Sequence, residues 1–397
     1  MQKKELIYLC EIFDTNRMPG QLFLPLMERF SSIGYNVSVL VGNSGNVSFT
    51  NSNSINIIQC GLNINGKKNY FLRTVSYSSY LFGALVFLIV KGKSKRIIGT
   101  SNPPFANFIL YLAYAIRGIT YEFVMLDVFP DGLIRINAIN GNSLICKIWR
   151  RINRATYSRA KVVYCLGRDM VDLMNVEYGL DREKLIYVPH WSSAKNFFSY
   201  EFKDSRFVIE NKLTDKFIVQ YSGNMGLWHD MVTFVKSAYV LREVKEIVFL
   251  FIGDGVSKKN AINLANSLNL SNIIWKDFVQ FEKLNDSLSA CHVALISLKS
   301  NLAGVAVPCK FYGILASGRA VIAQVPNQSE IALAINEDEL GVQVDPGDFK
   351  RLAEVIYNLY QDRNLLDYYC SNALKVYNSK YTLESAFKKF IDDEYIS

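Results

Sequence analysis

The sequence predicts an α/β protein with two doubly wound domains in tandem. Short apolar runs of strand length alternate with longer amphipathic segments, and this alternation is typical of parallel sheets covered by helices. It stops in a polar, aromatic-rich stretch at residues 191–215 and then starts again. A length of 397 residues suits two domains, each large enough for its own hydrophobic core.

The first half, residues 1–195, is expected to form an N-terminal Rossmann-like domain. Its helices are predicted at residues 22–33, ahead of a glycine, and at residues 105–116, after two prolines. Its predicted strands are residues 6–10, 37–41, 96–100, 121–126, 161–165 and 185–188.

The second half, residues 205–379, is expected to form a C-terminal domain of the same type, and a terminal helix within residues 380–397 could pack back on the first. Ligands of doubly wound sheets bind beyond the carboxyl ends of the strands, so the loops there should carry the chemistry. Two such domains would face each other across a cleft. The predicted strands of this half are residues 217–221, 247–252, 273–275, 293–296, 320–323 and 341–344.

Composition narrows the functional class only partly. Hydrophobic residues make up 50% of the chain and charged residues 20%, which excludes a disordered or collagen-like protein. The net charge of +8 suits an anionic small substrate or an anionic membrane surface as readily as nucleic acid. Seven scattered cysteines argue against a disulfide or zinc framework, and the first residues do not resemble a signal peptide, so a cytoplasmic protein is expected.

A membrane contact is one of two interpretations of residues 73–96. The most apolar run, residues 80–90, has 11 residues, whereas a membrane span needs about 20, so no transmembrane helix is predicted. The wider stretch combines aromatic and aliphatic residues with a basic edge between Lys91 and Arg96. It is either an interfacial contact with an anionic membrane, or a helix buried against the sheet and followed by solvated lysines.

The strongest local signal for a ligand is the loop at residues 221–230, where Gly223 and Gly226 follow a strand and precede a helix. Glycines at such a turn let backbone N–H groups approach a phosphate. The alternative is a tight strand-to-helix turn without a ligand. A second turn, at residues 253–255, is better explained by positive φ angles than by a binding group. The G-x-G-x-x-G fingerprint is absent from the first strand–helix turn, which argues against a nicotinamide or flavin enzyme.

A third loop, residues 304–313, places Pro308 near a helix start and Lys310 in the first turn of that helix. A lysine at a helix N-terminus works against the helix dipole, so an anionic ligand shared by the helix and the lysine explains it better. The alternative is a solvated surface lysine.

Asp127 ends a predicted strand, where a carboxylate can hold or deprotonate an acceptor hydroxyl. The alternative is a cap on the turn that follows. Glu122, on the same strand, is expected to be buried or paired rather than catalytic. Arg168 follows another strand and is either a contact to the acceptor or a surface residue at a helix N-terminus.

Several motifs together resemble a known family. Those of the second half are Ser222-Gly223-Asn224-Met225-Gly226 with His229-Asp230, Gly253-Asp254-Gly255, Val307-Pro308-Cys309-Lys310-Phe311-Tyr312 and Ala316-Ser317-Gly318-Arg319-Ala320-Val321-Ile322. Those of the first half are Thr100-Ser101-Asn102-Pro103-Pro104 and Asp127-Val128-Phe129-Pro130. In order and spacing they resemble the retaining GT-B glycosyltransferases of family four, especially bacterial enzymes of O-antigen, capsule and colanic-acid assembly.

The resemblance implies a GT-B fold, two Rossmann-like domains facing a cleft, with the sugar donor bound by the second half and the acceptor by the first. It implies no cofactor, no metal ion and no nucleic acid. Where the family has two glutamates this chain has Val305 and Gly313, so Glu330 is expected to take over the contact to the sugar. Lys310 and Asp127 are the implied catalytic residues, and Asp127 and Arg168 are the implied acceptor-binding residues. The implied donor-binding residues are Gly20, Ser222, Gly223, Asn224, Gly226, His229, Phe278, Pro308, Lys310 and Glu330.

The function expected from these observations is a retaining, metal-independent transfer of a hexosyl or N-acetylhexosaminyl group. The donor would be a UDP-sugar or, less favoured, a GDP-sugar, and the acceptor a polyprenyl-linked saccharide at the inner face of the cell membrane. Two alternatives stay open: a non-catalytic protein that binds nucleotide sugars, and a GT-B epimerase acting on a UDP-sugar.

Overall fold

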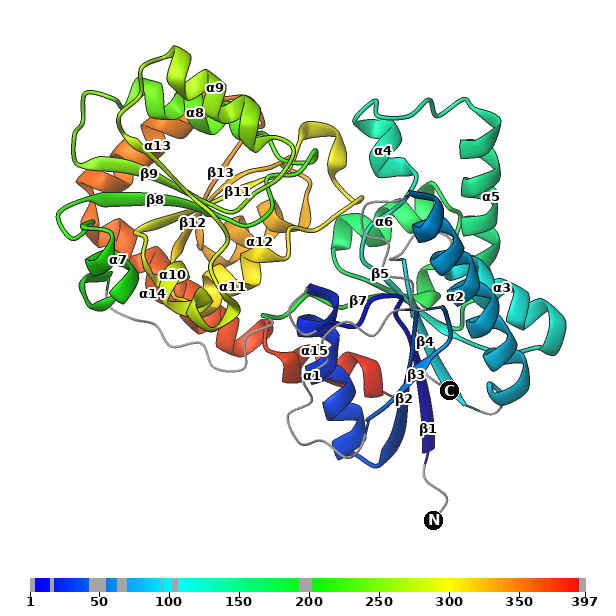
Figure 1. Ribbon diagram of the computed structural model, residues 1–397. Helices are drawn as coiled ribbons and strands as arrows, with labels where there is room; N and C mark the ends of the chain where they lie inside the picture. Colours follow the sequence, from blue (N-terminus) through cyan, green and yellow to red (C-terminus); the bar gives the residue numbers. More distant parts are fainter. Residues whose placement is uncertain are drawn as a thin grey trace. The chain divides into compact units, whose positions relative to one another are not determined.

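The computed structural model describes residues 4–14, 18–42, 55–62, 70–93, 95–101, 106–192 and 202–392. The chain divides into two compact units: unit 1 contains residues 1–189 and 386–397, and unit 2 contains residues 190–385. Each unit is built around one parallel sheet with helices on both faces (Figure 1). These two sheets confirm the predicted α/β class.

Unit 1 contains a seven-stranded sheet in the order β3-β2-β1-β4-β5-β6-β7, in which all neighbouring strands are parallel. Each strand predicted in this half overlaps an observed one. The sequence missed β3, because this strand lies at the edge of the sheet and buries only Ile55. The strands are β1 (Lys4–Leu9), β2 (Tyr35–Val41), β3 (Ile55–Gln59), β4 (Arg96–Thr100), β5 (Glu122–Met125), β6 (Val163–Cys165) and β7 (Leu185–Tyr187).

The helices of unit 1 pack on both faces of this sheet. On one face, Phe30 of α1 packs edge-on against Phe387 of α15, with ring centroids 5.0 Å apart. On the other face lie α2, α3 and α5, and α3 packs against both of its neighbours (Figure 1). The helices are α1 (Met18–Ser32), α2 (Tyr70–Lys91), α3 (Ala106–Arg117), α4 (Asp131–Arg135), α5 (Leu144–Arg159), α6 (Arg168–Val176) and the part of α15 (Leu383–Ile391) that falls in unit 1.

Helix α2 corrects the sequence estimate for residues 80–90. That run is the end of a 22-residue helix, and Phe71–Lys91 is long and apolar enough to cross a membrane by length and composition alone. The estimate counted only the uninterrupted apolar run, but the helix also continues through serines and a threonine. Tyr80, Ala84 and Leu88 are fully buried, so one side of α2 packs on unit 1.

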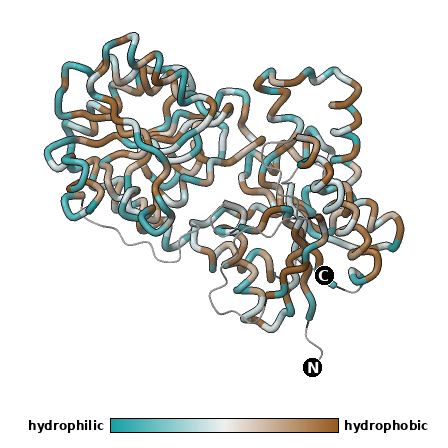
Figure 2. Tube along the Cα trace, in the orientation of Figure 1, coloured by the Kyte–Doolittle hydropathy of each residue, from teal (hydrophilic) through white to brown (hydrophobic). Residues whose placement is uncertain are grey.

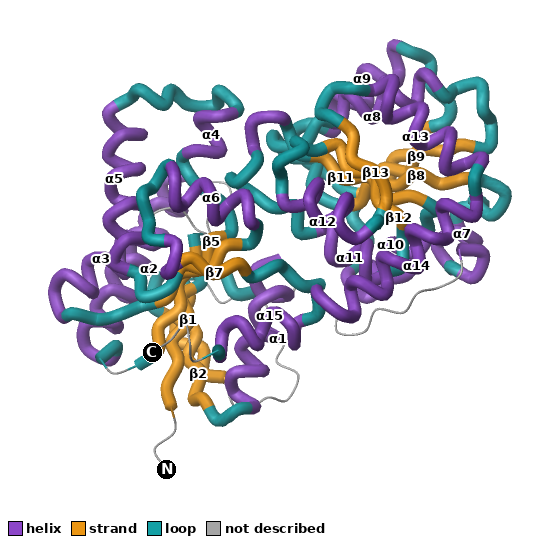
Figure 3. Tube along the Cα trace, turned by 180° about the vertical axis from the view of Figure 1, so that it is seen from behind, coloured by secondary structure: helices purple, strands orange, loops and turns teal. Residues whose placement is uncertain are grey.

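Unit 2 contains a six-stranded parallel sheet in the order β10-β9-β8-β11-β12-β13. Seen from behind, α8, α9 and α13 cover one face of this sheet and α10, α11, α12 and α14 cover the other (Figure 3). The strands are β8 (Phe217–Ser222), β9 (Ile247–Ile252), β10 (Ile273–Lys276), β11 (Val293–Ser297), β12 (Ala320–Gln324) and β13 (Gly341–Val344). The helices are α7 (Arg206–Glu210), α8 (Met231–Val240), α9 (Lys258–Ser267), α10 (Leu284–Ser289), α11 (Lys310–Ala316), α12 (Glu330–Asp338), α13 (Phe349–Gln361) and α14 (Arg363–Lys380).

The strand order alone indicates the edge of each sheet at which a ligand is expected. In unit 2 the chain moves outward from β8 to β9 and β10, and outward in the opposite direction from β11 to β12 and β13. The loops that follow β8 and β11 therefore diverge and leave a crevice at the carboxyl ends of these two strands. In unit 1 the corresponding pair is β1 and β4.

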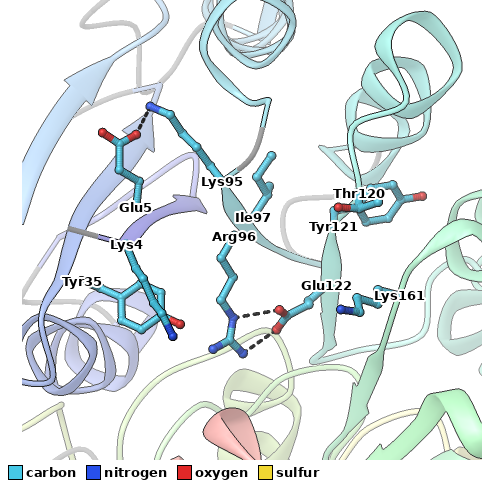
Figure 4. A pocket seen from close by; sticks show the side chains of 10 residues that line it. All are labelled: Lys4, Glu5, Tyr35, Lys95, Arg96, Ile97, Thr120, Tyr121, Glu122 and Lys161. Atoms are coloured by element: carbon cyan, nitrogen blue, oxygen red, sulfur yellow. Dashed lines mark hydrogen bonds and ion pairs between the residues drawn. The ribbon is translucent and has the colours of Figure 1, made fainter. Parts of the chain in front are cut away.

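A buried ion pair lies at the opposite, amino-terminal edge of the unit 1 sheet. The Arg96 guanidinium donates to both carboxylate oxygens of Glu122, at 2.8 and 2.7 Å, and to the Phe390 carbonyl. Tyr164 also donates to Glu122, at 2.9 Å. Figure 4 shows this pair in a hollow between β1, β4 and β5. Glu122 is therefore both buried and paired, as the sequence predicted.

We expect Arg96→Ala to lower the free energy of unfolding of unit 1 by about 3–5 kcal/mol, because the Glu122 carboxylate would stay buried without its cation. The control is Arg351→Ala, which breaks an exposed pair with Glu354 and should cost less than about 1 kcal/mol. Denaturant unfolding of both variants measures the difference. Equal losses would mean that Arg96 does not stabilise unit 1 through its buried charge.

Candidate functional site

The glycine-rich loops after β8 and β9 pack backbone against backbone. A Cβ on Gly253 would lie 2.1 Å from the Gly223 carbonyl oxygen, and one on Gly255 would lie 2.5 Å from that of Met225. Both glycines also have positive φ angles, +129° and +150°. The turn at residues 253–255 is therefore required by packing, as the sequence interpretation favoured.

The amide of Gly223 is not available to a ligand. Gly223 N–H donates to the Ile252 carbonyl at 2.9 Å, and Met225 N–H donates to that of Asp254 at 2.8 Å. Within the described residues, the N–H groups of Asn224 and Gly226 have no acceptor. If this loop holds a phosphate, Asn224 and Gly226 supply the amides, and Gly223 supplies the turn.

Lys310, the first residue of α11, lies over this loop. Its ammonium donates to the Tyr221 hydroxyl at 2.6 Å and lies 3.8 Å from the centre of that ring. A Cβ on Gly223 would come within 3.3 Å of the Lys310 nitrogen. Gly223 thus leaves the space that the lysine uses, and the structure brings together two residues that the sequence placed in one site.

Lys310 has no acidic partner among the described residues. Burial lowers its pKa to about 7, so the ammonium is only partly charged near neutral pH. A half-buried amine without a counter-charge is an unfavourable arrangement that an anionic ligand would relieve.

His229 lies beside Lys310 as a neutral ring. Its Nδ1 is 2.7 Å from the Ser297 carbonyl oxygen, at the end of β11. Burial, and to a smaller extent the nearby Lys310, lower the pKa of His229 to about 3. Because a carbonyl only accepts, Nδ1 carries the proton and Nε2 is left as an acceptor. This tautomer suits a ligand hydroxyl better than a phosphate.

The neighbouring Asp230 has a structural role. It caps α8 by accepting from the Val232 and Thr233 amides, and it also accepts from the Gln324 side chain at 3.2 Å. These bonds fix the start of α8 and with it the position of His229.

The other predicted donor-binding residues of unit 2 lie at the carboxyl edge of its sheet. Phe278 follows β10, has 59% of its surface exposed and lies 3.3 Å from a Cβ built on Gly253. Pro308 is buried and its carbonyl accepts from Phe311, while Glu330 begins α12 and is 2% exposed. Ser222 is half-buried at the end of β8.

Asp127 follows β5 in unit 1. The amides of Leu126 and Asp127 both donate to the Ser101 hydroxyl, at 2.9 and 3.0 Å, which ties this turn to the end of β4. The carboxylate itself makes no hydrogen bond or ion pair with the described residues, so it does not cap the next turn. Burial raises the pKa of Asp127 to about 7, a value suited to a general base.

The two remaining predicted residues also lie in unit 1. Arg168 is the first residue of α6, and its guanidinium carbon lies 5.9 Å from the Tyr187 ring centre. Gly20 is buried in the first turn of α1 rather than in a loop. Asn102 to Pro104 of the motif after β4 lie outside the described residues.

Sequence reasoning missed Ser297, and it named Tyr221 and Ser101 within motifs without giving either a role. Tyr221 looks like an ordinary apolar strand residue, and only its place directly before the glycine loop hints at another role. The two serines each end a strand, and polar residues in this position are a usable signal that the sequence analysis did not apply. Within the described residues, no group of three or more His, Cys, Asp or Glu could hold a metal ion.

Comparison with known proteins assigns the second unit. Residues 216–362 match the family described as Glycosyl transferases group 1. The probable glycosyltransferase WbjE of Pseudomonas aeruginosa is 26% identical over 280 residues, which are 70% of this chain and 70% of that protein.

Solved structures match nearly the whole chain. WaaG, a glycosyltransferase involved in lipopolysaccharide biosynthesis, superposes with a TM-score of 0.73 at 14% identity and covers 96% of this chain and 98% of its own. Anabaena Alr3699/HepE, solved in complex with UDP, has a TM-score of 0.69 at 11% identity and covers 98% of this chain and 99% of its own. The chain therefore has the GT-B fold, and its residues 216–362 form a Glycosyl transferases group 1 domain.

Proposed function

We propose that this protein is a glycosyltransferase that moves a hexosyl or N-acetylhexosaminyl group from a nucleoside-diphosphate sugar, with UDP favoured over GDP. The observation that carries the proposal is the half-buried Lys310 ammonium, which faces a glycine loop and has no acidic partner among the described residues. WbjE and WaaG, both named as glycosyltransferases, and HepE with its bound UDP support the same conclusion.

The acceptor in this proposal is a polyprenyl-linked saccharide used in cell-surface polysaccharide synthesis. The lipopolysaccharide role printed for WaaG supports this class of acceptor. The enzyme would act in the cytoplasm, as a peripheral protein on the inner face of the cell membrane.

Lys310 would act on the leaving group. As the bond between the sugar and the diphosphate breaks, negative charge grows on the diphosphate, and a nearby ammonium lowers the energy of that state. The free amides of Asn224 and Gly226 would hold the same phosphates. The transfer is proposed to retain the anomeric configuration, through an oxocarbenium-like sugar and without a covalent nucleophile.

Asp127 would accept the proton of the attacking acceptor hydroxyl. Its carboxyl is half-buried and free of partners among the described residues, and its raised pKa gives it the basicity that this step needs. Arg168 is proposed to contact the acceptor from the end of β6, the next strand in sequence order.

The remaining residues are proposed to orient the donor. Phe278 would stack on the base, because an exposed ring beside a glycine turn offers a flat apolar surface. His229 would accept a hydrogen bond from a sugar or ribose hydroxyl through Nε2. Glu330 would bind sugar hydroxyls, with Ser222, Pro308 and Gly20 shaping the site.

The proposal is tested with purified protein and a panel of UDP- and GDP-sugars. Thermal-shift measurements identify the donor, and product analysis with and without a polyprenyl-linked acceptor identifies the reaction. Transfer supports the proposal. Binding without turnover would identify a non-catalytic protein, and conversion of the donor sugar without an acceptor would identify an epimerase.

Lys310→Ala is expected to lower turnover about tenfold to a hundredfold, the effect of losing a charge-assisted hydrogen bond of about 1.5–3 kcal/mol. It should also weaken inhibition by UDP. The control is Lys350→Ala, which removes an exposed lysine from the first turn of α13. Unchanged UDP inhibition in Lys310→Ala would remove this residue from the donor site.

Asp127→Asn is expected to reduce transfer about 10²- to 10⁴-fold while UDP inhibition stays close to wild type. Only the proton acceptor is lost, so slow hydrolysis of the donor should continue. Asp172→Asn, at an exposed carboxylate of α6, is the control. Loss of nucleotide binding in Asp127→Asn would contradict the assignment of this residue to the acceptor.

The affinity for UDP is expected to fall as the pH rises above about 7, by up to tenfold per pH unit between pH 7 and 9. Above its own pKa the free protein holds Lys310 mostly uncharged, whereas the diphosphate favours the charged form, so binding must take up a proton. Calorimetry in buffers of different ionisation enthalpy measures this uptake. A pH-independent affinity, or the same slope in Lys310→Ala, would contradict the role of Lys310.

Activity is expected to survive an excess of EDTA, because Lys310 and the loop amides would supply the positive charge that a metal ion supplies elsewhere. Initial rates with and without the chelator provide the measurement. Complete loss that Mg²⁺ or Mn²⁺ restores would show that these groups are not sufficient.

A further inference from the structure

The exposed apolar side chains of unit 1 gather on one layer of helices. Eight of the eleven large hydrophobic residues described as exposed in this unit lie on α2, α3 and α5. On α2, Phe71, Phe82 and Val90 are 73%, 70% and 65% exposed, and on α5, Leu144 and Ile145 are 71% and 72% exposed. The three helices lie side by side in both views, and Figure 2 shows apolar segments along them.

The charge of this layer has one sign. The sequences of α2, α3 and α5 contain no Asp or Glu, and they contain eight Lys or Arg residues. Arg150 is neutralised by Asp131 and Glu177, at 2.8 and 3.1 Å. Lys147 and Arg151 are exposed, and neither has a partner among the described residues. The layer therefore combines exposed apolar surface with uncompensated positive charge.

We propose that the outer surface of α2, α3 and α5, called the basic layer below, binds an anionic phospholipid bilayer with α2 lying along the interface. Apolar side chains next to cations, without any acid, match the boundary between acyl chains and anionic headgroups. A helix of 22 residues is about 33 Å long, so the contact is broad rather than a single pocket. A second copy of this chain is a poor occupant, because it would place like charges face to face.

Helix α2 is held on unit 1 and does not leave it to span the bilayer. A Cβ on Gly83 would lie 1.8 Å from the Cys60 carbonyl oxygen, so the helix backbone touches the segment that follows β3. Tyr80, Ala84 and Leu88 are buried in the same stretch of the helix. Spanning the bilayer would require α2 to give up these contacts, whereas an interfacial position keeps them.

The basic layer is connected to the Asp127 turn. Asn153 of α5 donates to the Phe129 carbonyl at 2.5 Å and accepts from Asn107 of α3 at 2.8 Å. Lipid contact would therefore be made by the same helices that hold the turn proposed to meet the acceptor. This last consequence rests on the proposed function, but the lipid contact itself does not.

The test is sedimentation of the full-length protein with vesicles of phosphatidylcholine alone or with added phosphatidylglycerol. The wild type should bind the anionic vesicles at low salt, release at high salt and bind the neutral vesicles weakly. Phe82→Ser/Val86→Ser/Val90→Ser and, separately, Lys147→Glu/Arg151→Glu should each weaken binding to anionic vesicles by about tenfold or more.

Matched variants of unit 2 are the controls: Ile209→Ser/Val240→Ser/Tyr357→Ser for exposed apolar residues and Lys350→Glu/Lys375→Glu for charge. They should bind vesicles like the wild type. Denaturant unfolding, measured without vesicles, should stay unchanged in all four variants and shows that they are folded.

The proposal is overturned if the wild type does not bind anionic vesicles, if it binds neutral ones equally well, or if the unit 2 variants lose as much binding as the basic-layer variants. Protein that stays in cell membranes through an alkaline carbonate wash would overturn the interfacial position of α2. Since vesicle binding is measured without donor or acceptor, its failure leaves the glycosyltransferase proposal standing, and absence of transfer leaves the lipid contact standing.

Discussion

A half-buried lysine without an acidic partner among the described residues is the constraint on which the ligand edge of unit 2 depends. Removing an ammonium from water is costly, and within the described residues Lys310 is compensated by the ring and hydroxyl of Tyr221. Tyr221 in turn donates to the Asn224 carbonyl at 2.7 Å and so holds the loop that follows β8. A Cβ on Gly223 would lie 3.3 Å from the lysine nitrogen, so a side chain at this position would crowd the ammonium. A bound anion would supply the counter-charge that the Lys310 ammonium lacks among the described residues.

Unit 1 contains the corresponding arrangement for an acid, the carboxyl of Asp127. Burial raises the pKa of Asp127 to about 7 and lowers that of Lys310 to about 7, and neither group has an oppositely charged partner among the described residues. The buried charges that stabilise unit 1 are paired instead, because the Arg96 guanidinium donates to both carboxylate oxygens of Glu122. Within unit 1 the paired charges of Arg96 and Glu122 suit a structural role, and the Asp127 carboxylate, without an ion pair among the described residues, suits the proposed chemical role.

Sequence patterns predicted the parts of the structure that burial determines. The central strands β4 and β9 were predicted at their observed bounds, because buried parallel strands are continuous apolar runs. The edge strand β3 was missed because most of it is not buried, and the length of α2 was underestimated because serines interrupt its apolar run. Pro308 and the glycines pointed to Lys310, but no sequence pattern could show that the Gly223 amide is already used or that Tyr221 lies under the lysine. Those facts depend on contacts between segments far apart in the chain.

The two faces of the unit 1 sheet show why an exposed apolar helix can persist in a folded protein. On one face, Phe30 is covered by Phe387 and Phe390 of α15, so that layer is closed by the chain itself. On the other face, α2 buries a single stripe and leaves Phe82 and Val90 in solvent. Leaving such residues exposed forgoes roughly 1.5–3 kcal/mol of burial for each side chain. The folding of unit 1 alone does not explain why α2, α3 and α5 leave apolar side chains exposed and contain no acidic residue. The proposed contact with an anionic bilayer explains both features.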